Sequence, residues 1–242
     1  MELLDLYTLV GTNTYPGRGI VLGLTPKADK AMLAYFIMGR SGNSRNRVFE
    51  ARPQTGGIRT KAADPAKLED PSLIIYHPVR TIGTTQIVTN GDQTDTIYQT
   101  MMQGGTFEQA LRTRTFEPDA PNFTPRISGL LQLDDSQARC SYKLSILKSA
   151  DGNPQGCRRY FYEYQPVAGE GHFIHTYRCD GAPIPSFEGE PWRVQMPQEP
   201  QELAEKLWNS LNPDNKVSLF VRSICLTTGQ TQDVLINQYH SV

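Results

Sequence analysis

Short apolar segments rich in Val, Ile, Tyr, Phe and Thr recur along the whole chain, and glycines and prolines interrupt them repeatedly. β-Branched and aromatic residues favour strands, whereas Gly and Pro favour the turns between strands. The sequence therefore predicts many short strands and few helices. The predicted strands are residues 19–24, 30–38, 73–76, 86–89, 126–133, 138–147, 157–164, 172–177 and 217–226. A turn over residues 25–29 joins the first two as a hairpin.

Three segments carry helix signals. Thr94 can cap a helix that Gly104 and Gly105 end. Thr106 opens a second helix with the spacing of a capping box. A third helix, over residues 200–211, places leucines on one stripe. Strands with a few separate helices predict an α+β layered fold, and 242 residues fit a single domain over residues 1–242.

The remaining long stretches, residues 52–70 and 180–200, are polar and contain several prolines and glycines. Clusters of such residues between apolar segments are typical of loops. We therefore expect two long surface loops.

The charges of the chain nearly cancel, with 24 Lys+Arg against 25 Asp+Glu. This balance provides no general basic field for nucleic acid, so an anion site must be local. The apolar stretch over residues 31–38 is far shorter than the roughly 20 residues of a membrane helix. The first residues carry acids where a secretory signal carries bases. We expect a cytoplasmic protein that binds neither nucleic acid nor membrane.

Four cysteines lie far apart, without a C-x-x-C pair. Zinc sites and redox centres usually show such closely spaced pairs. The cysteines are therefore predicted to be reduced and mostly buried.

The densest polar cluster, residues 39–47, contains Arg40, Arg45 and Arg47 among glycine, serine and asparagine. Arginine guanidinium groups form bidentate hydrogen bonds with phosphate oxygens, and small residues let backbone N–H groups approach an anion. The alternative interpretation is a solvated basic turn.

A second cluster, residues 89–96, includes Asn90, Gly91 and Asp95 and precedes a predicted helix. Helix N-termini attract anions and carbonyl oxygens, but Asn-Gly is also an ordinary turn. A third cluster, residues 116–126, contains Glu117 and Arg126 next to prolines, which make the segment rigid. An acid and an arginine there could transfer a proton and stabilise charge, or form a surface salt bridge.

Tyr76 ends a predicted strand just before Pro78. A tyrosine at a strand end can line a pocket. It can equally belong to the core with its hydroxyl satisfied at the edge.

Five segments between residues 15 and 130 follow one another in a recognisable order. They are Tyr15-Pro16-Gly17-Arg18-Gly19-Ile20, the Arg40–Arg47 loop, Tyr76, Asn90-Gly91-Asp92-Gln93-Thr94-Asp95-Thr96-Ile97 and Thr124-Pro125-Arg126-Ile127. Together they resemble the archaeal-type IMP cyclohydrolase family. The resemblance implies closure of 5-formamidoimidazole-4-carboxamide ribotide (FAICAR) to IMP with loss of water, in de novo purine biosynthesis, with no metal and no cofactor.

The same resemblance implies a fold and partners. The fold is a four-layer αββα sandwich of two mostly antiparallel sheets, similar to the N-terminal nucleophile hydrolases, with residues 1–14 as an N-terminal extension. The implied partners are the nucleotide substrate and a separate AICAR transformylase. A homo-oligomer remains open.

Positions in the matching motifs also imply roles for individual residues. Arg47 and Tyr76 would hold the formyl oxygen, and Glu117 would take the carboxamide proton. The nucleotide pocket would be lined by Asn90, Gly91, Asp95 and Thr124, while Arg40, Arg45 and Arg126 would meet phosphate.

Two other functions remain open at this point. An amidohydrolase of the N-terminal nucleophile type would have to lose a leader, for example up to Thr14, to free its nucleophile. A non-catalytic purine nucleotide-binding module would keep the anion-binding loops without turnover.

Overall fold

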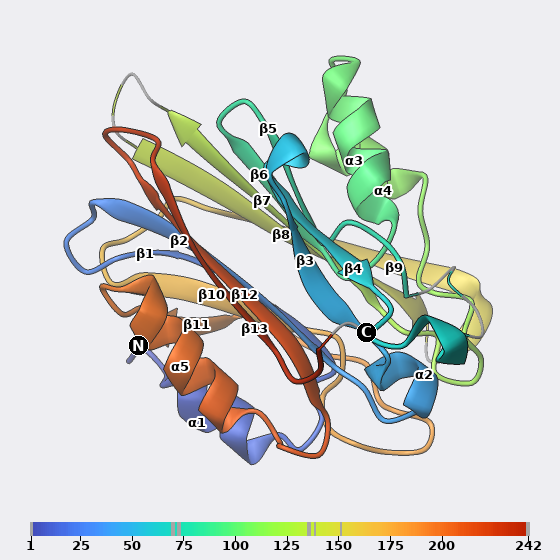
Figure 1. Ribbon diagram of the computed structural model, residues 1–242. Helices are drawn as coiled ribbons and strands as arrows, with labels where there is room; N and C mark the ends of the chain where they lie inside the picture. Colours follow the sequence, from blue (N-terminus) through green and yellow to red (C-terminus); the bar gives the residue numbers. More distant parts are fainter. Residues whose placement is uncertain are drawn as a thin grey trace.

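Two antiparallel β-sheets stack face to face and form the centre of the molecule (Figure 1). This computed structural model describes residues 2–68, 71, 74–134, 137, 139–150 and 152–240. In spatial order, the first sheet consists of β11 (Trp192–Gln195), β10 (Glu170–His175), β1 (Arg18–Leu24), β2 (Lys30–Met38), β12 (Lys216–Cys225) and β13 (Thr231–Asn237). The second consists of β3 (Val48–Arg52), β4 (Gly57–Lys61), β5 (Val79–Ile82), β6 (Thr85–Thr89), β7 (Arg126–Asp134), β8 (Arg139–Ala150) and β9 (Asn153–Tyr164).

The hairpin of β1 and β2 is confirmed, and it forms the middle of the first sheet. Its turn is fixed by Thr25, whose backbone N–H donates to Lys30 O at 3.0 Å and whose hydroxyl donates to the Asp29 carboxylate at 2.7 Å. Every residue of β1 is buried, because the second sheet covers one face and helices cover the other. Strands buried on both faces show continuous apolar sequence rather than alternation.

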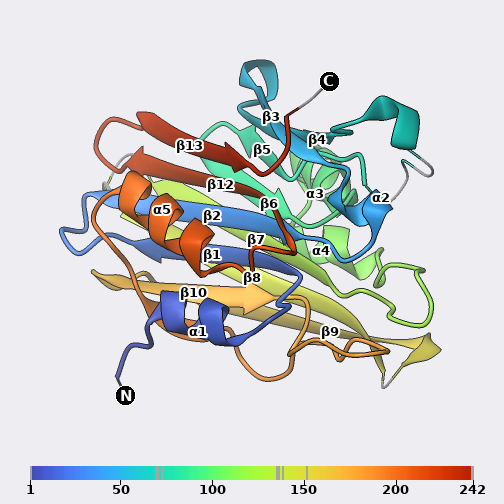
Figure 2. The ribbon, with the colours of Figure 1, turned by 60° about the horizontal axis from the view of Figure 1, so that its bottom comes forward.

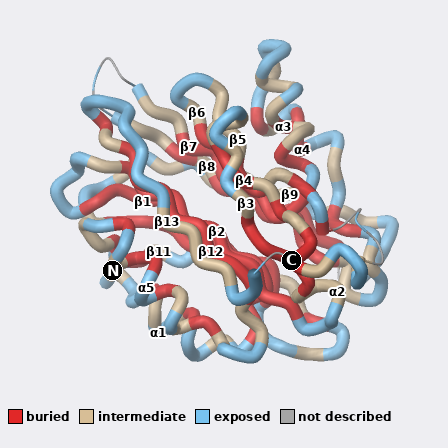
Figure 3. Tube along the Cα trace, viewed as in Figure 1, coloured by how far each residue is buried: buried red, intermediate tan, exposed pale blue. Residues whose placement is uncertain are grey.

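Helices form the two outer layers. α1 (Leu6–Thr12) and α5 (Pro200–Ser210) lie on the outer face of the first sheet (Figure 2). α3 (Gln93–Met102) and α4 (Phe107–Arg112) lie on the outer face of the second. The buried chain therefore follows the sheets and the inner helix faces (Figure 3). The predicted α+β class and the sandwich of two antiparallel sheets are confirmed, and the likeness to N-terminal nucleophile hydrolases stays a prediction.

The leucine stripe of α5 explains how one outer layer is held. Leu203 and Leu207 are fully buried against the first sheet, and burying such a side chain contributes about 2 kcal/mol. The capping box at Thr106 is also confirmed, since its hydroxyl accepts from Gln109 N at 3.1 Å. The cap of α3 is Asp92 rather than Thr94.

Some predictions of secondary structure were wrong. The predicted strand 73–76 lies partly outside the described residues, and residues 74–76 form a turn and a bend. They bond to one residue of β4, Thr60, without forming a strand ladder: Thr60 Oγ1 donates to Ile74 O at 2.6 Å, and Tyr76 N donates to Thr60 Oγ1 at 2.8 Å. β6 pairs on one side with β5, which the sequence reasoning missed, and on the other with β7.

The two predicted long loops also contain strands. β4 and the short 3₁₀ segments at Pro53–Thr55 and Pro65–Lys67 lie within residues 52–70, and β11 lies within residues 180–200. Both strands are short and half polar, so their pairing partners rather than their own sequences define them.

The cysteines are unpaired, but the expectation that most are buried was wrong. Cys179 is exposed, and the other three are partly exposed. Among the described residues, no helix has both the length and the hydropathy that a membrane span needs.

Candidate active site

Several strand ends meet at one end of the sandwich. β1 begins there with Arg18 and β7 with Arg126, while β6 ends beside Asn90. β1 contacts β7 across the interface between the sheets. The short helix α2 (Gly42–Arg45) lies at this end, opposite the hairpin that joins β7 and β8 (Figures 1 and 2). Loops from both sheets can therefore bring polar side chains together here.

The three residues predicted to be catalytic belong to one buried cluster at this end. Arg47 is 0 % exposed, Glu117 2 % and Tyr76 5 %. The charges of Arg47 and Glu117 both act on the pKa of Tyr76, and Arg47 acts on the pKa of Glu117. Arg18 joins the same cluster and is also buried.

Glu117 is a buried carboxyl group surrounded by guanidinium groups. Burial raises its pKa to about 6, because a charged carboxylate is poorly solvated in the interior. Arg18 and Arg126 act in the opposite direction and limit this increase. Glu117 is therefore mostly ionised at neutral pH and accepts a proton readily.

The guanidinium group of Arg47 is held at its Nε atom, whereas its two Nη atoms are free. Its Nε donates to Ser44 O at 2.9 Å, within a turn that the Ser41 capping box fixes. Both Nη atoms are buried, and neither has a hydrogen-bond partner among the described residues. Burial, together with the charge of Arg18, lowers the pKa of Arg47. Unpaired buried N–H groups are costly, so an oxygen of a ligand fits them.

Arg18 was part of a matched motif, but the sequence reasoning assigned it no role. Its Nε is buried without a partner among the described residues. Burial lowers the pKa of Arg18, but the carboxylate of Glu117 and nearby tyrosines outweigh this effect and raise it overall. The preceding Gly17 has φ +79, and a Cβ there would lie 2.3 Å from Thr176 Oγ1. Only glycine fits this position, and the backbone turn there directs Arg18 toward the cluster.

Thr124 connects the loop of Glu117 to the first sheet. Its carbonyl accepts from Glu117 N at 2.9 Å, and its hydroxyl is 2.5 Å from Tyr177 Oη. The carboxylate of Asp119 accepts from Thr124 N at 2.7 Å and from the Thr124 hydroxyl. Tyr177, which the sequence reasoning missed, thus helps to fix the predicted base.

Arg40 lies at the rim rather than inside the cluster. Its guanidinium is 5.2 Å from the ring centroid of Tyr15, which stacks on Tyr177 at 5.7 Å. Its Nη1 donates to Asp180 at 2.5 Å. Arg40 can meet a phosphate there only if this partly exposed ion pair opens.

Asn90 ties the end of β6 to the start of β7. Its Nδ2 donates to Pro125 O at 2.9 Å, and its Oδ1 accepts from Ile127 N at 2.9 Å and Gln93 Nε2 at 3.0 Å. The amide therefore builds the wall of the site.

Gly91 lies against the charged groups of the site. A Cβ at this position would lie 2.5 Å from Arg126 Nη1, 2.7 Å from Gln93 Oε1 and 3.5 Å from Glu117 Oε1. Arg126 Nη1 in turn donates to Gln93 Oε1 at 2.7 Å and pairs with Asp92 at 2.7 Å. The structure thus brings Gly91, Arg126 and Glu117 close together.

Two predicted residues have other partners. Arg45 donates to Gly39 O at 2.9 Å and to Asn215 Oδ1 at 3.2 Å. Asp95 accepts from Arg80 at 2.6 Å. Arg45 therefore ties α2 to neighbouring loops and Asp95 ties α3 to β5, and the structure does not place either group in the cluster.

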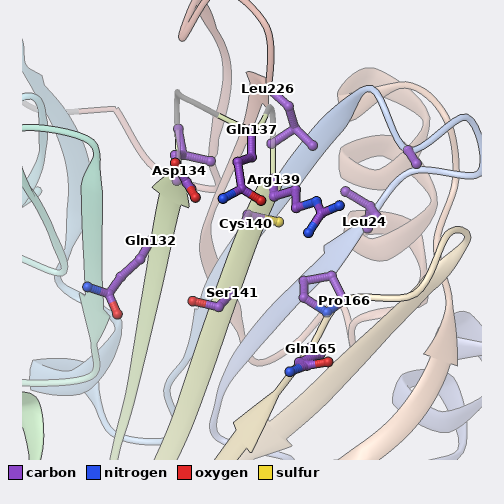
Figure 4. A pocket seen from close by; sticks show the side chains of 12 residues that line it. Leu24, Gln132, Asp134, Gln137, Arg139, Cys140, Ser141, Gln165, Pro166 and Leu226 are labelled. Carbon is purple, nitrogen blue, oxygen red and sulfur yellow. The ribbon is translucent and has the colours of Figure 1, made fainter.

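A large cavity lies elsewhere, at the opposite end of the sandwich (Figure 4). It has a volume of about 640 Å³, and its walls come from the β7–β8 hairpin and the ends of β1, β9 and β12. None of the predicted site residues is among the described residues that line it. Its lining includes Arg139, Gln132 and Cys140, without a carboxylate held between arginines. The buried cluster, not cavity size, therefore identifies the candidate active site.

The fold and the cluster together define an α+β sandwich protein with a buried cluster of arginines, a tyrosine and a carboxyl group at one end. The family model described as IMP cyclohydrolase-like protein matches residues 15–229, so the chain belongs to this family. The match confirms the family resemblance and extends well beyond residue 130. No curated protein matches the chain.

Proposed function

We propose that the protein is an IMP cyclohydrolase, which closes FAICAR to IMP with loss of water in de novo purine biosynthesis. Membership in the IMP cyclohydrolase-like family supports an enzyme of this kind. The substrate and the role of each residue are part of the proposal and rest on the buried cluster.

The reaction determines what such a site must supply. The carboxamide nitrogen of the substrate attacks the carbon of its formyl group, and both groups are in one molecule. The enzyme must rotate these groups into contact, remove a proton from a weakly basic nitrogen and stabilise negative charge on the formyl oxygen. The hydroxyl group formed must then leave as water.

Glu117 suits the proton transfers. At pH 7 a carboxyl group with a pKa of about 6 is roughly nine-tenths ionised. Its carboxylate takes a proton from the carboxamide nitrogen as the new C–N bond forms. This proton passes to the former formyl oxygen, which becomes a hydroxyl. The formamide nitrogen then loses its own proton, a proton reaches the hydroxyl, the C–O bond breaks, and water leaves as the C=N bond forms between the former formyl carbon and the formamide nitrogen.

Arg47 and Tyr76 suit the stabilisation of the formyl oxygen. The free Nη groups of Arg47 and the hydroxyl of Tyr76 can both donate to the formyl oxygen. These donations grow stronger as negative charge develops, so they favour the transition state over the substrate. Burial in a water-poor interior increases their effect.

One observation carries the proposal: Arg47, with two unpaired buried Nη groups, shares a buried cluster with Tyr76 and Glu117. These residues are 29 to 70 positions apart in the sequence. A purely structural arginine at 0 % exposure would have partners for these N–H groups.

The test is a spectroscopic assay of purified protein with FAICAR, with wild type and Glu117→Gln measured side by side. The ultraviolet change of a forming purine ring should appear with wild type and fall at least 100-fold with Glu117→Gln, while IMP affinity stays within a few fold. Equal rates for the two proteins would remove Glu117 from the chemistry.

The same experiment separates the other functions. IMP binding without turnover by wild type would favour a non-catalytic nucleotide-binding module. Loss of a leader from the active protein, seen as a lower intact mass, would favour an amidohydrolase. If cyclisation is observed, a separate AICAR transformylase is the expected source of the substrate.

A further inference from the structure

A second tyrosine lies behind Tyr76. The hydroxyl of Tyr35, on β2, is 2.8 Å from the hydroxyl of Tyr76. Tyr35 is 0 % exposed, and the pKa of each phenol is raised, chiefly by burial. Both hydroxyls also lie close enough to Arg47 to affect its pKa. The two phenols therefore form a neutral, hydrogen-bonded pair beside the free end of Arg47.

The fold holds Tyr35 rigidly. On β2 it is paired with Ile20 of β1 on one side and Phe220 of β12 on the other. Its ring stacks on Phe49 of the opposite sheet, with centroids 5.7 Å apart. Tyr76 lies in an irregular segment, held through the backbone by Thr60. The ordered partner of the pair is therefore Tyr35, and Tyr76 takes its position from it.

The direction of the hydrogen bond follows from the partners of each group. Among the described residues, Tyr76 Oη is the hydrogen-bond partner that the Tyr35 hydroxyl has. If Tyr35 donates, its proton is satisfied and the proton of Tyr76 remains available for a ligand. If Tyr76 donated, the Tyr35 proton would be buried without an acceptor, which costs about 1–3 kcal/mol. When a ligand oxygen lies beside Tyr76, only the first arrangement satisfies both protons, so it is the stable one in the complex.

We propose that Tyr35 is a positioning residue for Tyr76: its hydroxyl donates to Tyr76 Oη and so directs the Tyr76 proton to the formyl oxygen held by Arg47. This inference rests on the proposed cyclohydrolase function. In a chain of hydrogen bonds each donor strengthens the next. Tyr35 thus improves Tyr76 as a donor without touching the substrate.

The test is a double-mutant cycle in the FAICAR assay, with Tyr35→Phe, Tyr76→Phe and both substitutions together. We expect Tyr35→Phe to lower kcat about tenfold with KM within about twofold, because the contact acts through the transition state. Tyr76→Phe should lower kcat about 100-fold, as expected for loss of one direct donor to an oxyanion. The double variant should be no slower than Tyr76→Phe, because Tyr35 then has no hydroxyl to position.

Tyr142→Phe is the matched control. Tyr142 is 1 % exposed, and its hydroxyl is 2.7 Å from His172 Nδ1 near the opposite end of the sandwich. The Tyr142→Phe substitution should lower the melting temperature about as much as Tyr35→Phe does and leave kcat unchanged. Phe keeps the ring contacts of Tyr35, and a thermal melt of each variant verifies folding.

Each outcome decides the inference. An active wild type with an unchanged Tyr35→Phe, or a double variant slower by the product of both effects, refutes positioning and leaves the proposed function intact. A wild type without turnover refutes the proposed function, and the role of Tyr35 falls with it.

Discussion

Replacement of Arg18 by methionine should shift the pH dependence of the enzyme. Arg18 is the largest of the charges that lower the pKa of Glu117, which burial raises to about 6. Methionine keeps much of the aliphatic length and removes the charge. Loss of an adjacent opposite charge typically raises the pKa of a carboxyl group by about 1–2 units. The Glu117 carboxyl of Arg18→Met should then titrate near pH 7 to 8.

The expected size of the effect follows from the ionised fraction of Glu117. Wild type is roughly nine-tenths ionised at pH 7, whereas the variant should be about one-half to one-tenth ionised. Since the base works as a carboxylate, kcat/KM at pH 7 should fall about twofold to tenfold. It should recover above about pH 9, where Glu117 of the variant is ionised again.

The assay is kcat/KM for FAICAR between about pH 5 and 10, which reports the groups of the free enzyme. Arg139→Met, in the cavity at the opposite end, is the matched control and should leave the profile unchanged. An acid limb at the same pH in both Arg18→Met and wild type would refute the reasoning. A loss that is equal at every pH would instead show that Arg18 binds the substrate directly.

Two further predictions concern stability and space in the site. Glu117→Gln should stabilise the protein above pH 6 by about 2 kcal/mol, because a pKa raised from 4.5 to about 6 means that ionisation destabilises the fold. The gain should be nearly absent below the unfolded pKa and complete above the folded one, so denaturant unfolding at about pH 3.5 and 8 should show it only at pH 8. Gly91→Ala should lower kcat/KM at least tenfold, since its Cβ would lie 2.5 Å from Arg126 Nη1; steady-state kinetics check this, and an unchanged value would mean that Arg126 can move away harmlessly.

Local patterns predicted much of the fold because those elements carry their own signals. β2 was predicted with its observed bounds, and the Thr106 capping box marked the start of α4. α1 was missed because it has only seven residues and its stability comes from packing on α5 and the first sheet. β4 was missed because its neighbours, not its own residues, make it a strand.

The site was predicted less completely, for a similar reason. Arg47, Tyr76 and Glu117 came from the resemblance, since their local sequences left ordinary turns and core positions as alternatives. Tyr35 lies in a strand whose residues are almost all buried, so alternation could not separate a site residue from a core residue. Its role depends on Tyr76, which is 41 positions away and becomes a neighbour only in the fold.

The most direct test of the central claim is a crystal structure of the protein with IMP bound. The buried cluster predicts that N1 of the base, formerly the carboxamide nitrogen, lies about 3 Å from the Glu117 carboxylate. C2, formerly the formyl carbon, should lie against Arg47 and Tyr76. A nucleotide bound instead in the cavity beside Arg139, with the cluster closed and unchanged, would contradict the account.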